Sequence, residues 1–229
     1  NRRPDVICFV NGIPLVFMEL KAHHTDLRNA YTDNITDYKD TIPHVFYSNA
    51  FIILSNGTDA KVGTITSPYK FFLDWKRITE EEEGIVSLDT MLRGTCSKQN
   101  LLDIFENFLL FDDNGGEVVK IMAKNHQYIG VNKVLSQVNN IDELQGKLGV
   151  FWHTQGSGKT YTMIKTAELL FKAPQAEKPT ILLMIDRNEL EDQMLKNLTS
   201  IGVSFDVIVN AFNQLQAINH VCNDCGETN

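Results

Sequence analysis

The chain has 229 residues, of which 43% are apolar, 9% aromatic and 22% charged, so its composition is globular and excludes disordered, collagen-like and coiled-coil proteins. Its 21 basic and 29 acidic residues give a formal charge of -8, which argues against coating nucleic acid by bulk attraction but leaves room for a local DNA groove. With four cysteines and no apolar stretch near the roughly 20 residues of a membrane helix, we expect a cytoplasmic protein without a membrane partner.

The first block of the chain has the pattern of a small α/β unit. In chain order we expect strands over 5–10, 15–21, 51–54 and 61–65, with a helix from Thr25 or Asp26 between the second and third. Asn11-Gly12-Ile13-Pro14 predicts a hairpin turn between the first two strands. The helix carries one apolar stripe, formed by Leu27, Tyr31, Ile35 and Tyr38.

The middle of the chain is more polar. Residues 75–93 read as a linker, and a helix behind Ser97 is expected to include Phe108 and Leu109 and to end before Asn114.

The last block alternates helices and strands. We expect helices from about His126, over 159–171 and over 187–198, and strands over 148–152, 180–185 and 205–209. This βαβ order predicts a parallel sheet with helices on its faces.

A glycine-rich loop follows the expected strand 148–152 and opens the next helix. It reads His153-Thr154-Gln155-Gly156-Ser157-Gly158-Lys159-Thr160, which is a phosphate-binding loop in the context that such a loop requires. Its backbone amides and the helix dipole favour an anion, Lys159 is suited to the β- and γ-phosphates, and the Thr160 hydroxyl to Mg²⁺. His153 stands where glycine is commonest. The alternative interpretation is a flexible glycine turn capped by Thr160.

Two segments near this loop bear on the ligand. Residues 185–193, with Asp186 and Arg187, follow a strand at the carboxyl edge of the expected sheet, where α/β proteins place ligands. Gln127 precedes the loop, and a glutamine amide is able to read an adenine edge with two hydrogen bonds. A surface glutamine is the simpler alternative.

The first two strands carry two acids and a lysine. Glu19 and Lys21 are two residues apart on a strand and therefore share a face, while Leu20 packs on the other. Asp5 lies on the preceding strand. Phosphodiester hydrolysis can use such a set, in which two carboxylates hold Mg²⁺ and a neighbouring lysine orients the attacking water. Alternatively, Asp5 only starts a strand and Lys21 only ends one.

Pairing register decides whether the two acids meet. A three-residue loop, Asn11 to Ile13, or an equivalent bulge sets Asp5 opposite Glu19, whereas a two- or four-residue loop separates them. Both strands are apolar on both faces, and this pattern is typical of central strands. An acid near a core needs a partner or a metal, so we predict the register that brings the acids together.

These motifs together resemble a known family. Asp5-Val6-Ile7, Asn11-Gly12-Ile13-Pro14-Leu15, Glu19-Leu20-Lys21 and the loop from His153 to Thr160 resemble the restriction (motor and nuclease) subunit of type I restriction-modification enzymes. The order of the blocks matches over nearly the whole chain. The resemblance implies a PD-(D/E)xK nuclease domain with a mixed sheet, followed by the start of a RecA-like, superfamily 2 P-loop domain.

The resemblance also assigns residues. It implies that Asp5 and Glu19 bind the nuclease Mg²⁺ and that Lys21 is the catalytic lysine. Asn34 and Tyr38 fall where the family has a Gln-x-x-x-Tyr helix motif, with Asn in place of Gln. The resemblance assigns ATP to Gln127, Gln155, Gly156, Ser157, Gly158, Lys159 and Thr160. Ser55-Asn56-Gly57 resembles a family segment to which we assign no role.

The implied organisation is a partial endonuclease domain over 1–92, a connecting helix and linker over 93–120, and a partial first RecA-like domain over 121–229. The implied function is ATP-dependent translocation on double-stranded DNA coupled to Mg²⁺-dependent cleavage, by an enzyme that works with methyltransferase and specificity subunits in a prokaryotic cytoplasm. The alternative is a nucleotide-binding regulatory module, or another superfamily 2 helicase, with an inactive nuclease-like domain.

Some expected parts are missing from the sequence. No Asp-Glu-x-His segment follows the loop, and such nuclease folds normally begin with a helix and an acid upstream of Asp5. We therefore expect a fragment that binds ATP without turning it over and does not cut DNA alone. Cys222 and Cys225, near His220, form half a zinc site or, more simply, two ordinary thiols.

Overall fold

The computed structural model describes residues 3–113, 116–176, 179–184 and 188–200. The expected strand over 205–209, the motif residues Asp186 and Arg187, and the pair Cys222 and Cys225 lie outside these ranges.

A four-stranded mixed sheet forms the N-terminal part. Its strands are β1 (Val6–Val10), β2 (Ile13–Leu20), β3 (Phe51–Ser55) and β4 (Ala60–Gly63), in the order β1-β2-β3-β4. β2 and β3 are parallel, and the two outer pairs are antiparallel. β3 is buried along its whole length, whereas β1 is an edge strand of this sheet and is only partly buried, contrary to the expected central position.

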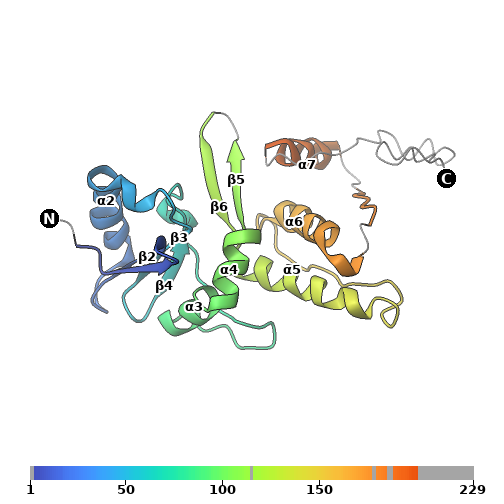
Figure 1. Ribbon diagram of the computed structural model, residues 1–229, viewed down its shortest axis with the longest axis horizontal. Coiled ribbons are helices and arrows are strands. Elements are labelled where there is room, and N and C mark those ends of the chain that lie inside the picture. The colour runs from blue at the N-terminus through green and yellow to red at the C-terminus, as the bar shows by residue number, and fades with distance from the viewer. Residues whose placement is uncertain (1–2, 114–115, 177–178, 185–187, 201–229) are drawn as a thin grey trace.

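Helical segments cover both faces of this sheet (Figure 1). The segment after β2 comprises α1 (Leu27–Asn29), the π-helix η1 (Ala30–Ile35), α2 (Thr36–Thr41) and the 3₁₀ turn η2 (Pro43–Phe46). Tyr31, Ile35 and Tyr38 of its apolar stripe belong to one core cluster with Phe17, Ile52 and Leu54 of the sheet. The Asp26 carboxylate caps the segment by accepting a hydrogen bond from the Arg28 amide at 2.8 Å, as the sequence predicts.

The opposite face of the sheet is covered by α3 (Leu88–Thr95) and α4 (Lys98–Asn107), and this core continues into α5 (Asn125–Gln137). Trp75 lies at its centre, with Tyr128 at a ring distance of 5.4 Å. Two short 3₁₀ turns, η3 (Tyr69–Phe71) and η4 (Val138–Asn140), follow β4 and α5 in the chain.

Two elements of the middle region differ from expectation. Helix α3 includes residues 88–93, which were expected to belong to a linker, and it forms because Ser87 caps its first turn and Met91 is fully buried. The helix behind Ser97 ends at Asn107, and the next residues form β5 (Leu109–Asp113), which pairs with β6 (Val118–Met122) as an antiparallel hairpin. Cross-strand pairing overrides the helical spacing of Phe108 and Leu109.

The C-terminal part has the expected helices. They are α5, α6 (Lys159–Lys172) and α7 (Asn188–Ser200), with a short turn η5 (Pro174–Ala176). Helices α6 and α7 pack through Ile164, Met194 and Leu198.

The parallel strand expected at 148–152 is not formed, and neither is the described part, 180–184, of the strand expected at 180–185: both segments run without sheet pairing. A strand requires a hydrogen-bonded neighbour, and neither segment has one there. Trp152 is accordingly 94% exposed and Met184 84%. No helix in the described ranges has the length and apolar character needed to cross a membrane.

Candidate functional site: an acid pair with lysine, and a glycine loop

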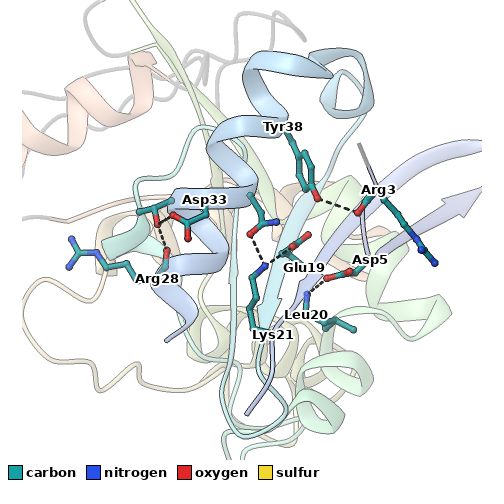
Figure 2. A network of polar contacts seen from close by, with 10 residues as sticks. Arg3, Asp5, Glu19, Leu20, Lys21, Arg28, Asp33 and Tyr38 are labelled. Atoms are coloured by element: carbon teal, nitrogen blue, oxygen red, sulfur yellow. Dashed lines mark hydrogen bonds and ion pairs between the residues drawn. The ribbon is translucent and has the colours of Figure 1, made fainter. Parts of the chain in front are cut away.

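Glu19 and Lys21 meet at the end of β2. The Lys21 ammonium donates a hydrogen bond to Glu19 Oε1 at 3.0 Å, so both side chains share one face, as the sequence predicts (Figure 2). Glu19 is 2% exposed, and its second oxygen, Oε2, is buried without a hydrogen-bond partner. Leu20, expected to pack on the other face, is instead 37% exposed.

Burial raises the pKa of Glu19, the hydrogen bond from Lys21 opposes this, and the negative charge of Asp5 raises the pKa further. A buried carboxylate with an unpartnered oxygen beside a second acid is costly unless a cation neutralises it. The donor set, carboxylate oxygens, is the one that Mg²⁺ prefers.

Asp5 is brought beside Glu19 by a bulge in the β1–β2 hairpin. The turn is the two-residue Asn11-Gly12, with positive φ at both positions, and Val10 pairs with Ile13. The register shifts between Cys8 and Phe9, so Leu15 of β2 has no partner in β1. Beyond this bulge, Val6 pairs with Met18. The bulge, one of the two predicted alternatives, therefore sets Asp5 opposite Glu19.

The Asp5 carboxylate is fixed by the backbone between the other two residues. Its Oδ2 accepts a hydrogen bond from the Leu20 amide at 2.8 Å (Figure 2). Asp5 itself is exposed, so the acid pair opens to solvent on one side.

Asn34 and Tyr38 reach the same region from the helical segment. Asn34 Oδ1 accepts a hydrogen bond from the Lys21 ammonium at 2.6 Å, and the Tyr38 hydroxyl donates to the Arg3 carbonyl at 3.2 Å. Asn34 lies in η1, where the Thr36 amide bonds the Tyr31 carbonyl, five residues back. π-Helical turns often occur at functional sites, and helical periodicity alone did not indicate this one.

Ser55-Asn56-Gly57, which had no assigned role, supports the chain around Lys21. The Ser55 carbonyl accepts from the Lys21 amide at 2.8 Å. The Asn56 side chain donates to the Thr25 carbonyl at 2.9 Å and accepts from the amides of Thr58 and Asp59. The β3–β4 turn therefore holds the segment that follows Lys21.

The glycine loop from His153 to Gly158 leads into α6, whose first two residues are Lys159 and Thr160. Gly156 and Gly158 have φ of +76° and +92°, conformations that favour glycine. The Lys159 ammonium donates to the carbonyls of His153 and Thr154 at 2.9 Å each, so it folds back over the loop. Ser157 Oγ is buried without a partner, and the glycine backbone with a lysine over it fits a bound phosphate chain.

Gln127 belongs to the same site through the backbone of the loop. Its Nε2 donates to the Gly158 carbonyl at 2.9 Å and to Thr162 Oγ1 at 3.1 Å, and its Oε1 accepts from the Lys124 amide at 2.8 Å. The side chain is 7% exposed, so it is not the surface residue of the simpler alternative. It ties the start of α5 to the start of α6.

Two histidines flank the loop, a pairing that no local sequence pattern indicates. The rings of His126 and His153 are 4.6 Å apart, edge to face, and His126 Nε2 lies 3.3 Å from the Ser157 carbonyl. Burial lowers the pKa of both, with a further lowering of His126 by His153 and of His153 by Lys159.

The remaining predicted ligands lie at the mouth of the loop: Gln155 is exposed and Thr160 half-buried. The structure thus brings Asp5, Glu19, Lys21 and Asn34 together at one site. It brings Gln127 and residues 153–160 together at another.

Comparison with known proteins gives matches for both sites. Residues 1–71 match the family described as type I restriction enzyme R protein N terminus, and residues 126–223 match the SWI2/SNF2 ATPase family. The first match contains the acid pair and Lys21, and the second contains the glycine loop.

Curated relatives cover most of the chain. The chain is 36% identical, over 87% of its length, to the type I restriction enzyme HindI endonuclease subunit of Haemophilus influenzae. It is 28% identical, again over 87%, to a putative type I restriction enzyme endonuclease subunit, MjaIXP, of Methanocaldococcus jannaschii. A Staphylococcus saprophyticus endonuclease subunit, SsaAORF53P, is 24% identical over 83% of the chain.

The chain spans about a fifth of the length of these relatives, at 20%, 21% and 20% respectively. The matched region holds both sites in the order that the sequence predicts. The chain belongs to the family of type I restriction enzyme R proteins.

Proposed function

We propose that the full-length protein is an ATP-dependent translocase and Mg²⁺-dependent endonuclease that acts on double-stranded DNA within a type I restriction complex. The chain contributes a PD-(D/E)xK-like nuclease site and the phosphate loop of a RecA-like motor. The proposed partners are methyltransferase and specificity subunits, in the cytoplasm of a prokaryote. The proposed division remains 1–92 for nuclease, 93–120 for connection and 121–229 for motor.

At the nuclease site, Asp5 and Glu19 are the proposed Mg²⁺ ligands. The unpartnered Oε2 of Glu19 and the nearby charge of Asp5 support this role, since both are relieved by a cation. A bound Mg²⁺ would supply a Lewis acid that stabilises negative charge on the scissile phosphate.

Lys21 would orient the attacking water and offset phosphate charge. Its ammonium is placed for this by two acceptors on different elements, Glu19 Oε1 in β2 and Asn34 Oδ1 in η1. A lysine restrained on two sides is preorganised, which lowers the cost of aligning it with the substrate.

At the motor site, residues 155–160 would hold the triphosphate of ATP, with the Thr160 hydroxyl toward its Mg²⁺. Lys159 now donates to two loop carbonyls, and phosphate oxygens would replace these acceptors. Gln127 is proposed to act on ATP by shaping the loop through Gly158, in addition to any reading of adenine.

The proposal rests on the presence of two sites in one chain. The first is the Glu19–Lys21 pair beside Asp5, and the second is the glycine loop with the Lys159 ammonium bonded to its carbonyls. The test uses the full-length subunit assembled with its partner subunits on a plasmid with a recognition site. Glu19→Gln and Lys21→Met should reduce DNA cleavage at least about a hundredfold while ATP hydrolysis stays within about twofold. Lys159→Ala should abolish ATP hydrolysis and cleavage together.

Glu106→Gln serves as the matched control, because Glu106 is an exposed acid on α4, away from both sites. It should leave both activities unchanged. Wild-type cleavage by Glu19→Gln would refute the nuclease assignment and favour a regulatory nucleotide-binding module. Wild-type cleavage by Lys159→Ala would refute ATP dependence.

A further inference from the structure

The β5–β6 hairpin stands between the two sites, in the stretch between residues 71 and 126 that neither family match covers. In Figure 1 it rises between the N-terminal sheet and the helices α6 and α7. Side chains alternate across a strand, so the two faces of the hairpin carry different residues. Asp112 is on one face, and the cross-strand pair Phe111 and Lys120 is on the other.

The Asp112 face contacts the helix of the glycine loop. The Tyr161 hydroxyl donates a hydrogen bond to Asp112 Oδ2 at 2.7 Å, and Tyr161 directly follows Lys159 and Thr160 in the first turn of α6. Asp112 is 6% exposed, and its Oδ1 is buried without a partner. Burial, together with the hydrogen bond and charge of Asp112, raises the pKa of Tyr161 to about 12.

Lys120 of β6 contacts the nuclease sheet at three points, two through its backbone and one through its ammonium. The Lys120 amide donates to Thr66 Oγ1 at 2.8 Å, and its carbonyl accepts from Thr64 Oγ1 at 2.6 Å, just beyond β4. The Lys120 ammonium donates to the carbonyl of Asn49, next to β3. The Asn49 side chain in turn donates a hydrogen bond to the Leu15 carbonyl at 3.1 Å. Leu15 lies in β2, which is the strand that carries Glu19.

We propose that the β5–β6 hairpin couples occupancy of the glycine loop to the nuclease sheet, with Tyr161, Asp112 and Lys120 as the positioning residues of this connection. The inference rests on the proposed function and adds the contacts through which one site controls the other. None of the three residues touches DNA or nucleotide in this scheme.

The physical basis is that one helical turn carries both the nucleotide ligands and the hairpin contact. When Lys159 exchanges its loop carbonyls for phosphate oxygens, the first turn of α6 adjusts, and the Tyr161 hydroxyl moves with it. The free energy of a buried carboxylate with one unpartnered oxygen changes strongly when the donor of its one hydrogen bond moves. The hairpin is thereby biased between two positions, as coupling between distant sites requires.

The experiment measures DNA cleavage per ATP hydrolysed in the assembled full-length complex. Tyr161→Phe should leave the kcat and KM of ATP hydrolysis within about twofold, because the hydroxyl bonds Asp112 and not the loop, but change cleavage per ATP by at least about fivefold. Lys120→Met should change it in the same direction. The double variant should differ little from either single variant, since both cut one connection.

Two further variants separate positioning from mere structural support. Asp112→Asn keeps a carbonyl oxygen for the Tyr161 hydroxyl and should retain most of the coupling, whereas Asp112→Leu should lose it. Lys172→Gln, which removes an exposed ion pair at the far end of the same helix, should leave cleavage per ATP unchanged. Melting temperatures identify any variant whose effect is general destabilisation.

Unchanged cleavage per ATP in both Tyr161→Phe and Lys120→Met would overturn the connection, and so would fully additive effects in the double variant. Failure of the proposed function gives a different result from failure of the connection: the Glu19→Gln or the Lys159→Ala variant would then cleave DNA as the parent complex does. If DNA cleavage requires both Glu19 and Lys159, and Tyr161→Phe leaves cleavage per ATP unchanged, only the connection is refuted.

Discussion

The side-chain oxygen of Asn34 lies 2.6 Å from the Lys21 ammonium, although Asn34 is on the helical segment and Lys21 follows β2. Asparagine is one methylene shorter than the glutamine of the family motif. The π-helical turn η1 changes the helical register around Asn34 and the contact is made with the shorter side chain. Lys21 therefore depends on a second element for its position.

Asn34→Ala removes one of the two acceptors of the Lys21 ammonium. In the full-length complex we expect DNA cleavage to fall about tenfold or more, because Lys21, the proposed catalytic lysine, loses its alignment, while ATP hydrolysis is unaffected. Cleavage rates on a plasmid substrate provide the measurement. Asn29→Ala, at an exposed asparagine of α1, should be silent, and equal effects of the two changes would contradict the role of Asn34.

Gln127→Leu removes three hydrogen bonds, one to the Lys124 amide at the start of α5 and two that join α5 to Gly158 and Thr162 at the start of α6. The Lys124 amide loses its acceptor, so we expect the free energy of unfolding to drop by about 1–3 kcal/mol. Nucleotide affinity should weaken as well, because the Gly158 carbonyl loses a donor. Urea unfolding and fluorescent-nucleotide titration measure the two effects. Gln137→Leu, at the end of the same helix, should show neither, and intact affinity in Gln127→Leu would count against its role.

The two glycines of the loop should respond differently to alanine. Gly156 has φ of +76° and open space around an added Cβ, so Gly156→Ala should cost roughly 1–2 kcal/mol of backbone strain. At Gly158, φ is +92° and a Cβ would lie 2.8 Å from Gln127 Nε2. Gly158→Ala should therefore lower stability more and displace Gln127. Thermal unfolding compares the two variants directly, and equal losses would show that the Gln127 contact is unimportant.

The histidine pair predicts how stability depends on pH. Both folded-state pKa values lie below the usual 6.5, so as pH falls through 6.5 the unfolded chain binds protons first and the folded state loses stability. The loss continues until pH reaches the folded-state pKa values. Urea midpoints at pH 7.5 and 5.5 should therefore differ less in His126→Gln and His153→Gln than in the parent. His44→Gln, at an exposed histidine of η2, should match the parent.

Local patterns were enough to predict the strands of the N-terminal sheet. The turn Asn11-Gly12, the cap Asp26 and the apolar runs each act over a few residues, and all the strands of the first sheet appear near their predicted places. The demand that two acids share a face selected the correct hairpin register. Of the two predicted alternatives, a three-residue loop and an equivalent bulge, the structure has the bulge, because the extra residue is Leu15 and does not belong to the turn.

Other features depend on contacts between distant segments. Asp112 and Tyr161 are 49 residues apart, and the sequence around either residue does not predict their hydrogen bond. The β5–β6 hairpin was hidden for a related reason, since Phe108 and Leu109 continue the helical spacing of α4 until pairing with β6 intervenes. The parallel strands at 148–152 and 180–185 were predicted from the alternating order of apolar runs and helical patterns, but pairing partners decide whether a strand forms.

The wide turn η1 makes the number of residues between β2 and Tyr38 a constraint in its own right. Deleting a single residue there would let the wide turn relax to an ordinary helical turn and change the position from which the Asn34 side chain reaches the Lys21 ammonium. Natural variants of this segment should then tolerate exchanged side chains more readily than an altered residue count.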